Sequence, residues 1–182
     1  PKWGMGDIII KDRTGEGVIN DEDRTVIGNS IPRFTFGLNL GFEYKGFDFS
    51  CFFQGVGKAD GYVTMEAIQP MGINGARKEH YKESFNPQDP KPGAYFPRIL
   101  SSDYNYAYMS HWVQDASYIR LKNLQIGYSF KIKGLNQLRV YASGENLFTA
   151  TKYRTWDPET PVGARGFYPN VAVYSMGVNL NF

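Results

Sequence analysis

The sequence has little of what several common functional classes require. Among its 182 residues there is one cysteine, Cys51, so no disulfide can form within the chain. The mean hydropathy is -0.42, and no apolar run approaches the roughly 20 residues of a membrane-spanning helix. The net charge is +2, and because the basic residues are not clustered, an extended nucleic-acid-binding surface is excluded.

Recognisable catalytic patterns are missing as well. The sequence has 2 histidines, His80 and His111, and neither belongs to an HExxH pattern. There is no nucleophile elbow, glycine-rich phosphate loop or paired-cysteine zinc pattern. No spacing of aspartate and glutamate identifies a general acid and its base. We therefore expect that this chain is not an enzyme.

Aromatic residues, by contrast, are abundant and regularly placed. They make up 16% of the chain, with 13 Tyr and 13 Phe. From Phe34 to Tyr44 large apolar residues alternate with small or polar ones, a period of two that puts the apolar set on one face of a strand. The alternation resumes from Phe47 to Phe53 after the turn dipeptide Lys45-Gly46, which predicts a hairpin.

Three further segments have the same pattern. One strand is predicted from Ser117 to Phe130, with a bulge near Lys122-Asn123 where the apolar phase slips, and another from Leu138 to about Leu147. The last strand spans 173–182, and its apolar positions are Tyr174, Met176, Val178, Leu180 and Phe182. This ending resembles the C-terminal insertion signal of bacterial outer-membrane proteins, whose final residue is usually Phe. The expected fold class is all-β, with the antiparallel strands of a transmembrane β-barrel.

The lengths of the connections predict an orientation. The turns at Lys45-Gly46 and Lys131 to Gln137 are short, whereas 56–112 and 148–172 are long. Outer-membrane barrels have short periplasmic turns and long extracellular loops, so we expect 1–33 and 56–112 to be extracellular. Because five strands cannot close a barrel, whose smallest form has about 8, we expect the chain to be the C-terminal part of a larger barrel.

An acidic segment near the start can be aligned with a calcium-binding loop. The candidate ligands are Asp12, Thr14, Glu16, the carbonyl of Val18, Asn20 and Asp23, with Gly17 at the turn position. The match is imperfect, because Thr stands at the third position and Asp replaces the bidentate Glu at the twelfth. The alternatives are a bound Ca2+ that braces the segment and a solvated acidic turn without metal.

Aromatic residues in the long connections are candidate ligand contacts. Aromatic faces beside polar groups suit sugar rings or peptides, but tyrosine and tryptophan are also frequent at membrane interfaces. The ligand-binding candidates are Tyr104, Tyr106, Tyr108, Trp112, Trp156 and Tyr168. Their loops also contain Tyr95, Phe96, Asp157, Arg165 and Phe167. For any one of these residues, an interface or packing role is the competing interpretation.

Several segments resemble one family in the order in which they occur. Gly6-Asp7-Ile8 is followed by the segment from Asp12 to Gly55, and the later segments read DASYIRLKNLQIGYSF, LRVYASGENLFTATKY and YSMGVNLNF. Together they resemble the C-terminal region of SusC/RagA-like TonB-dependent transporters of Bacteroidetes. The long connection 56–112 matches this family poorly.

The resemblance implies a 22-stranded outer-membrane barrel filled by an N-terminal plug, with the plug and most strands outside this sequence. It implies import of glycan oligosaccharides or peptides, a SusD-like surface lipoprotein as lid, and energy from TonB, ExbB and ExbD through the absent N-terminal region. Two alternatives stay open. A passive porin or adhesin barrel would explain the strands but not the family-like segments. A soluble calcium-binding β lectin would explain the acidic loop but not the terminal Phe.

Overall fold

The computed structural model describes residues 4–63, 65–70, 75–90, 92–100, 104–160 and 168–182. The chain divides into two compact units. The sheet unit consists of the described residues of Ser30–Gly61, Gln114–Pro161 and Gly166–Phe182. The loop unit consists of the described residues of Pro1–Asn29 and Tyr62–Val113. Each unit is described on its own.

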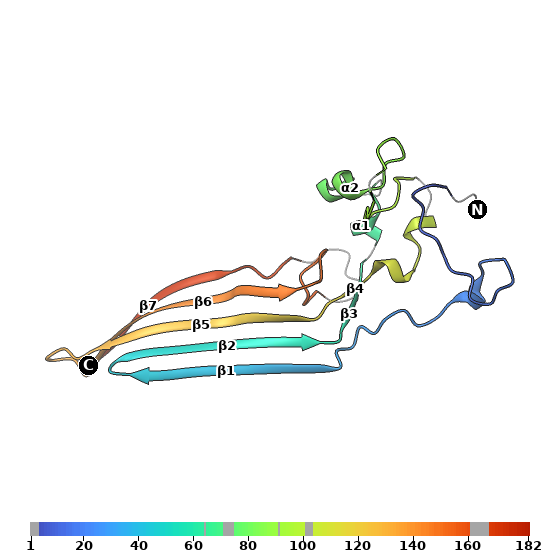
Figure 1. Ribbon diagram of the computed structural model, residues 1–182. Coiled ribbons are helices and arrows are strands. Elements are labelled where there is room, and N and C mark those ends of the chain that lie inside the picture. The colour runs from blue at the N-terminus through green and yellow to red at the C-terminus, as the bar shows by residue number, and fades with distance from the viewer. Residues whose placement is uncertain (1–3, 64, 71–74, 91, 101–103, 161–167) are drawn as a thin grey trace. The chain divides into compact units, whose positions relative to one another are not determined.

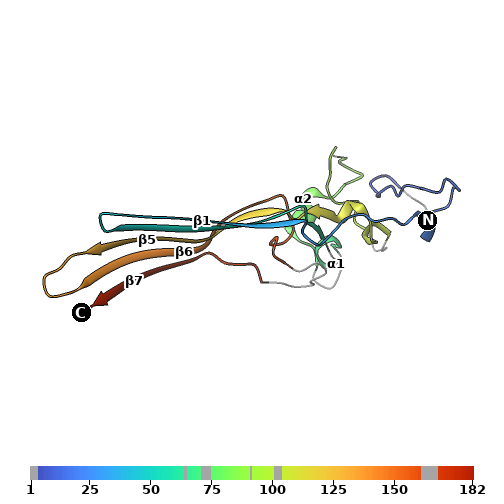
Figure 2. The ribbon, with the colours of Figure 1, turned by 90° about the horizontal axis from the view of Figure 1, so that it is seen from below.

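The sheet unit contains a 5-stranded sheet in the order β1-β2-β5-β6-β7. Each strand pairs antiparallel with its neighbour, so the sheet is a meander in which chain order and spatial order agree (Figure 1). Figure 2 shows β5, β6 and β7 running obliquely to β1, as the twist of an antiparallel sheet requires. The strands are β1 (Phe34–Tyr44), β2 (Phe47–Gly57), β5 (Tyr118–Phe130), β6 (Gln137–Thr151) and β7 (Val173–Asn181). The all-β, antiparallel prediction is confirmed.

Strand register gives the sheet one apolar and one polar face. Residues directly opposite each other share a face. One row across all five strands reads Leu40, Cys51, Leu124, Gly144 and Tyr174, and the neighbouring apolar rows continue with Phe42, Phe49, Ile126, Ala142 and Met176. A row on the other face reads Glu43, Asp48, Gly127, Tyr141 and Gly177. The period-two patterns of five separate segments therefore align in space.

The bulge expected near Lys122-Asn123 is present. The register of β5 shifts between Leu121 and Asn123, which leaves Lys122 as an extra residue. On β6 the prediction was too short, because the strand continues past Leu147 to Thr151. Asn146 has a positive φ of 53° at the irregularity, after which the apolar phase resumes with Phe148 opposite Leu121.

The short connections and the C-terminus lie at one end of the sheet. Lys45 and Gly46 have φ values of 49° and 88°, the left-handed conformation that a two-residue hairpin turn needs at both positions. The second short connection joins Phe130 to Gln137, and Gln137 pairs with Asn181 of the last strand. The predicted alternation of short turns and long connections is therefore confirmed as topology.

The connection between β2 and β5 contains regular structure. It includes β3 (Asp60–Tyr62), α1 (Met65–Ile68), α2 (Lys78–Glu83), η2 (Tyr104–Tyr106), η3 (Ser110–Trp112) and β4 (Val113–Asp115), and β3 pairs with β4 in a 2-stranded sheet. The segment before β1 has one further turn of 3-10 helix, η1 (Asp21–Asp23). No helix in the described part of the chain is long and apolar enough to cross a membrane. The range 56–112 is thus a folded segment with the last residues of β2 at its start.

Candidate functional site

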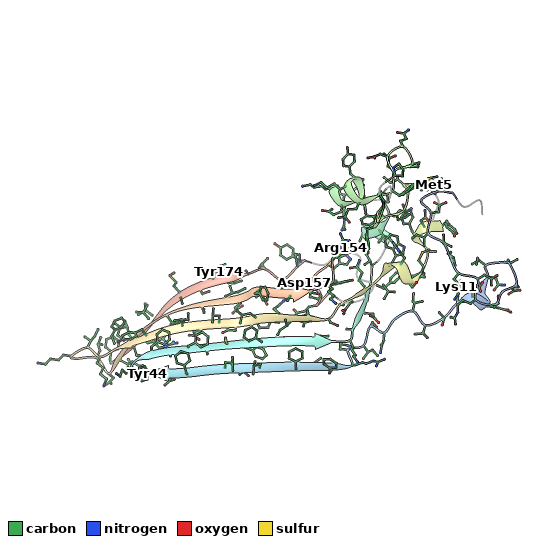
Figure 3. All side chains as sticks on the ribbon, viewed as in Figure 1. Met5, Lys11, Tyr44, Arg154, Asp157 and Tyr174 are labelled. Carbon is green, nitrogen blue, oxygen red and sulfur yellow. The ribbon has the colours of Figure 1, made fainter. Side chains whose placement is uncertain are left out.

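The apolar face of the sheet is exposed on the edge strands β1 and β7 and at positions of β5 and β6, while Cys51 of β2 is buried among its neighbours. On β1 the exposed fraction of Phe42 is 54%, and on β7 that of Met176 is 90%. The residues predicted as an insertion signal, Tyr174, Met176, Val178 and Leu180, all lie on this face, and Phe182 follows β7 directly. Figure 3 shows Tyr44 and Tyr174 on the two edge strands. Contiguous apolar surface of this extent is typical of a membrane or protein contact rather than of a solvated surface.

The polar face contains an ion pair that bridges two strands. Arg139 of β6 donates two hydrogen bonds to the carboxylate of Asp48 on β2, at 2.8 and 2.6 Å. The pair crosses Gly127 of β5, where an added Cβ would meet Asp48 Oδ2. The guanidinium carbon of Arg139 also lies 4.8 Å from the ring centroid of Tyr141. Gly127 is therefore small because the ion pair occupies the space above it.

A second polar cluster is centred on Arg120 of β5. Its side chain is 2% exposed and donates to Thr149, Asp157 and Glu159, at 2.8, 2.7 and 3.0 Å. Glu159 also accepts hydrogen bonds from Lys122 and from the hydroxyl of Tyr118. Burial is the largest single influence and raises the pKa of Glu159, but the bonds from Lys122 and Tyr118 together with the charges of Arg120 and Lys122 outweigh it and hold that pKa below its ordinary value.

The candidate ligand contacts fall in both units, four in the loop unit and two in the sheet unit. Trp112 is fully buried and Tyr106 is 4% exposed, so both belong to the core of the loop unit. The indole nitrogen of Trp112 donates to the carbonyl of Asn105, and its ring contacts those of Tyr95, Phe96, Tyr106 and His111. Trp112 and Tyr106 were expected to contact a ligand, but in the structure both rings pack in the core of the loop unit. Their burial leaves no ring surface that a ligand could contact.

The remaining candidates differ in exposure. Tyr104 donates its hydroxyl hydrogen to the carbonyl of Ile8. Tyr108 is 89% exposed and stacks on Tyr62, with ring centroids 5.1 Å apart. In the sheet unit Trp156 is partly buried and Tyr168 is 81% exposed. Arg165 and Phe167 lie outside the described residues. Tyr108 and Tyr168 are therefore the most exposed of the candidates, while Tyr104 and Trp156 are partly buried.

A charged cluster that sequence patterns did not indicate joins the two halves of the loop unit. Arg98 donates to both carboxylate oxygens of Asp7, at 2.7 and 2.6 Å, and Asn105 donates to the same carboxylate. Asn105 in turn accepts from the backbone N–H of Ile8. The hydrogen bonds from Arg98 hold the pKa of Asp7 well below its usual range, against the opposing effect of burial. The partners are more than 90 residues apart, a separation that no local pattern detects.

The predicted calcium loop is a tight acidic turn. Asp12 accepts from the backbone N–H groups of Gly15 and Gly17, and Asp23 accepts from those of Arg13, Thr14 and Asn20. The hydroxyl of Thr14 lies 3.2 Å from Asp12 and 3.0 Å from Glu16. Within the described residues, no three His, Cys, Asp or Glu side chains are placed together as metal ligands. Asp12 and Asp23 are both engaged by backbone amides, while Glu16 accepts from the hydroxyl of Thr14 and the side chain of Asn20.

Comparison with known proteins gives consistent relatives. No protein-family model matches the chain. It is 34% identical over 201 residues to TonB-dependent receptor P3 of Formosa agariphila, an alignment that covers 97% of this chain and 19% of the relative. It is 27% identical over 182 residues to TonB-dependent receptor SusC of Bacteroides thetaiotaomicron, covering 94% of this chain and 17% of SusC. The chain therefore spans about a fifth of the length of the curated relatives it matches.

Solved structures agree on the fold. A structure of the RagAB peptide transporter has a TM-score of 0.71 at 24% identity and covers 91% of this chain and 19% of that chain. The RagAB peptide importer in its open-open state has a TM-score of 0.67, covering 85% and 18%. The curated relatives are receptors, which agrees with the expectation that the chain is not an enzyme. The chain belongs to the TonB-dependent receptors and is a C-terminal part of a SusC-like member.

Proposed function

We propose that the intact receptor is an outer-membrane active transporter that imports oligosaccharides or peptides. The observation that carries this proposal is the two-faced sheet, whose apolar rows run across all five strands while the opposite rows are polar. Such a sheet suits a barrel wall, with the apolar face toward lipid and the polar face toward the interior. The short turns would then be periplasmic, and 1–33 and 56–112 would lie outside the cell.

The same proposal includes partners beyond this chain. A SusD-like surface lipoprotein would close over the receptor, and TonB with ExbB and ExbD would supply energy through the absent N-terminal region. The relationship to SusC and the fold shared with RagAB support this assembly. RagAB is described as a peptide importer, which favours peptides as one cargo class. The exposed ring of Tyr108, 89% accessible, suits a sugar or a peptide side chain equally.

Energy-dependent uptake by cells tests the proposal. Cells with and without the intact receptor would be given a fluorescent oligosaccharide series and a fluorescent peptide mixture, in the presence and absence of a protonophore. We expect one series to enter only with the receptor and only without the protonophore, and the receptor to fractionate with the outer membrane. Uptake that survives the protonophore would favour the passive porin. Recovery of the receptor in the soluble fraction would favour the lectin.

We also propose that Ca2+ braces the segment before β1. The support is local: oxygens of Asp12 and Glu16 lie within 3.2 Å of the hydroxyl of Thr14, and the carbonyl of Val18 and the side chain of Asn20 complete the expected set. Asp12 and Asp23 would each bind the ion only in exchange for hydrogen bonds from backbone amides. The proposed role is structural, since the segment contains no group placed for chemistry.

Protease resistance of 4–29 in the intact receptor tests the calcium proposal. We expect Ca2+ to raise this resistance over that in EGTA, and the double variant Asp12→Asn with Glu16→Gln to remove the difference. Asp21→Asn is the matched control, because Asp21 is an exposed acid of the same segment that pairs with Arg24. Equal resistance in Ca2+ and EGTA would refute calcium binding here.

A further inference from the structure

The chain stays against the sheet after β6. Residues 152–160, here called the strap, are anchored at their start by Gln114. Its side chain accepts from the backbone N–H of Arg154 at 3.0 Å and donates to the hydroxyl of Thr155 at 3.1 Å. The ring of Tyr153 is buried in the space left by Gly61, where an added Cβ would collide with it. The first half of the strap is thus fixed by side chains of the sheet unit.

The second half of the strap is a preformed turn. The backbone N–H of Thr160 donates to the carbonyl of Asp157, and that of Glu159 donates to the carboxylate of Asp157, both at 2.9 Å. Pro158 stands at the second position of this turn, where its fixed φ is favourable. The turn therefore holds the two carboxylates of Asp157 and Glu159 in a defined relation before they meet the sheet.

Both carboxylates are bound by cations of the polar face. Arg120 pairs with Asp157 at 2.7 Å and with Glu159 at 3.0 Å, and Lys122 pairs with Glu159 at 2.7 Å. The exposed fractions of the Arg120 and Asp157 side chains are 2% and 8%. Asn170, beyond the strap, donates to Glu159 as well. Removing one member of such a cluster leaves a buried charge without its partner, which strongly disfavours the conformation in which the strap is attached to the sheet.

The bulge of β5 lies directly at the second of the two cations. In an unbroken strand alternate residues share a face, and Arg120 and Lys122 both point to the polar side. Because Lys122 is the extra residue at the register shift, the apolar alternation resumes at Leu124 without placing a charge on the apolar face. Strand alternation thus places both cations on the polar face, and the bulge restores the apolar phase after them.

We propose that the strap is a fixed lining of the barrel interior, held by Arg120 and Lys122 as positioning residues, so that residues 152–160 narrow the passage and do not move as a lid. The interior location rests on the proposed function, in which the polar face is the inner one. The attachment itself rests only on contacts within the sheet unit. Arg120, Asp157 and Glu159 satisfy one another and are therefore not ligand contacts.

Hydrogen exchange of the intact, detergent-solubilised receptor tests the attachment. The amides of Tyr153, Arg154, Glu159 and Thr160 are all hydrogen-bonded in the closed arrangement. We expect Arg120→Met to speed exchange of the peptide 152–160 by about tenfold or more, and Glu159→Gln by a smaller factor. Arg139→Met is the matched control, because it breaks an ion pair on the same face that does not touch the strap.

A double variant distinguishes loss of the attachment between Arg120 and the strap from a general loss of stability. With Arg120 already replaced by Met, adding Asp157→Asn should not speed exchange further by more than about twofold, because the carboxylate of Asp157 has then already lost its guanidinium partner and the amide removes the unpaired buried charge. Unchanged exchange of 152–160 in Arg120→Met, or an equal rise in Arg139→Met, would overturn the proposal. If the Arg120→Met receptor does not assemble, the Glu159→Gln variant is the test of the attachment. Unchanged exchange of 152–160 in that variant would overturn the proposal.

A second exchange experiment tests whether the strap is fixed. Exchange of 152–160 in the intact receptor should be the same with the partner lipoprotein bound and removed, because the strap does not follow a lid. A difference above about tenfold would overturn the fixed lining. Neither readout requires uptake. Absence of energy-dependent import would refute the proposed function and the interior location but leave the attachment of the strap standing, whereas exchange results contrary to those expected would refute only the strap.

Discussion

Replacing Trp112 separates a packing role from a ligand contact. Trp112 is fully buried, and its ring contacts four other rings, among them Tyr106 and Phe96. Truncation of a buried tryptophan to alanine costs about 3 to 5 kcal/mol. The carbonyl of Asn105 would also lose its indole donor, which lies 2.9 Å away. A local loss of about 4 kcal/mol would raise the open population of the loop unit roughly a thousandfold.

The assay is hydrogen exchange of the peptide 104–113 in the intact receptor, with and without cargo. We expect Trp112→Ala to speed exchange about a thousandfold or to the intrinsic rate. Trp112→Phe should have a smaller effect, because it keeps an aromatic ring and loses one hydrogen bond worth about 1 kcal/mol. Tyr108→Ala is the control in the same segment, since that ring is 89% exposed. Loss of cargo binding in Trp112→Ala with unchanged exchange would refute the packing role.

Two further outcomes are expected. Gly46→Ala should destabilise the first hairpin by about 1 to 2 kcal/mol, because φ is 88° and the new Cβ would lie 2.7 Å from the carbonyl oxygen of Ser129. The measurement is the unfolding temperature of the intact receptor in a heat-modifiable mobility assay, which should be lower in the variant. Arg98 lowers the pKa of folded Asp7 below its unfolded value, so the stabilisation is complete above about pH 5 and shrinks as the pH falls toward the folded pKa. Asp7→Asn should therefore lower the urea concentration at which 4–29 becomes protease-sensitive at pH 7, and should lower it by a smaller amount near pH 3, where the unfolded carboxyl is largely protonated but the folded one is still ionised. A larger effect at pH 3 than at pH 7 would contradict the role of the charge.

The sheet could be predicted from the sequence because its cause is local. Each strand alternates apolar and polar residues, and β1 has the predicted bounds of Phe34 and Tyr44. The observed register agrees with the alternation, since pairing Phe42 with Phe49 keeps both side chains on the apolar face. Where the phase changes without a turn residue, as at Asn146, the prediction failed, and β6 was taken to end too early.

The contacts of the loop unit and the strap could not be predicted, for the opposite reason. An aromatic residue in an irregular segment has no period that shows which side is buried, so Trp112 has the same local sequence signal in a core, a membrane interface or a ligand site. Arg120 is part of a regular strand, yet its partners Asp157 and Glu159 lie 37 and 39 residues away. Alternation predicts that Arg120 lies on the polar face, but only the three-dimensional pairing explains why a guanidinium there is 2% exposed. A charged residue in the polar phase of a strand therefore indicates which face of the sheet is polar. Only its buried partners show that a connecting segment is attached to that face.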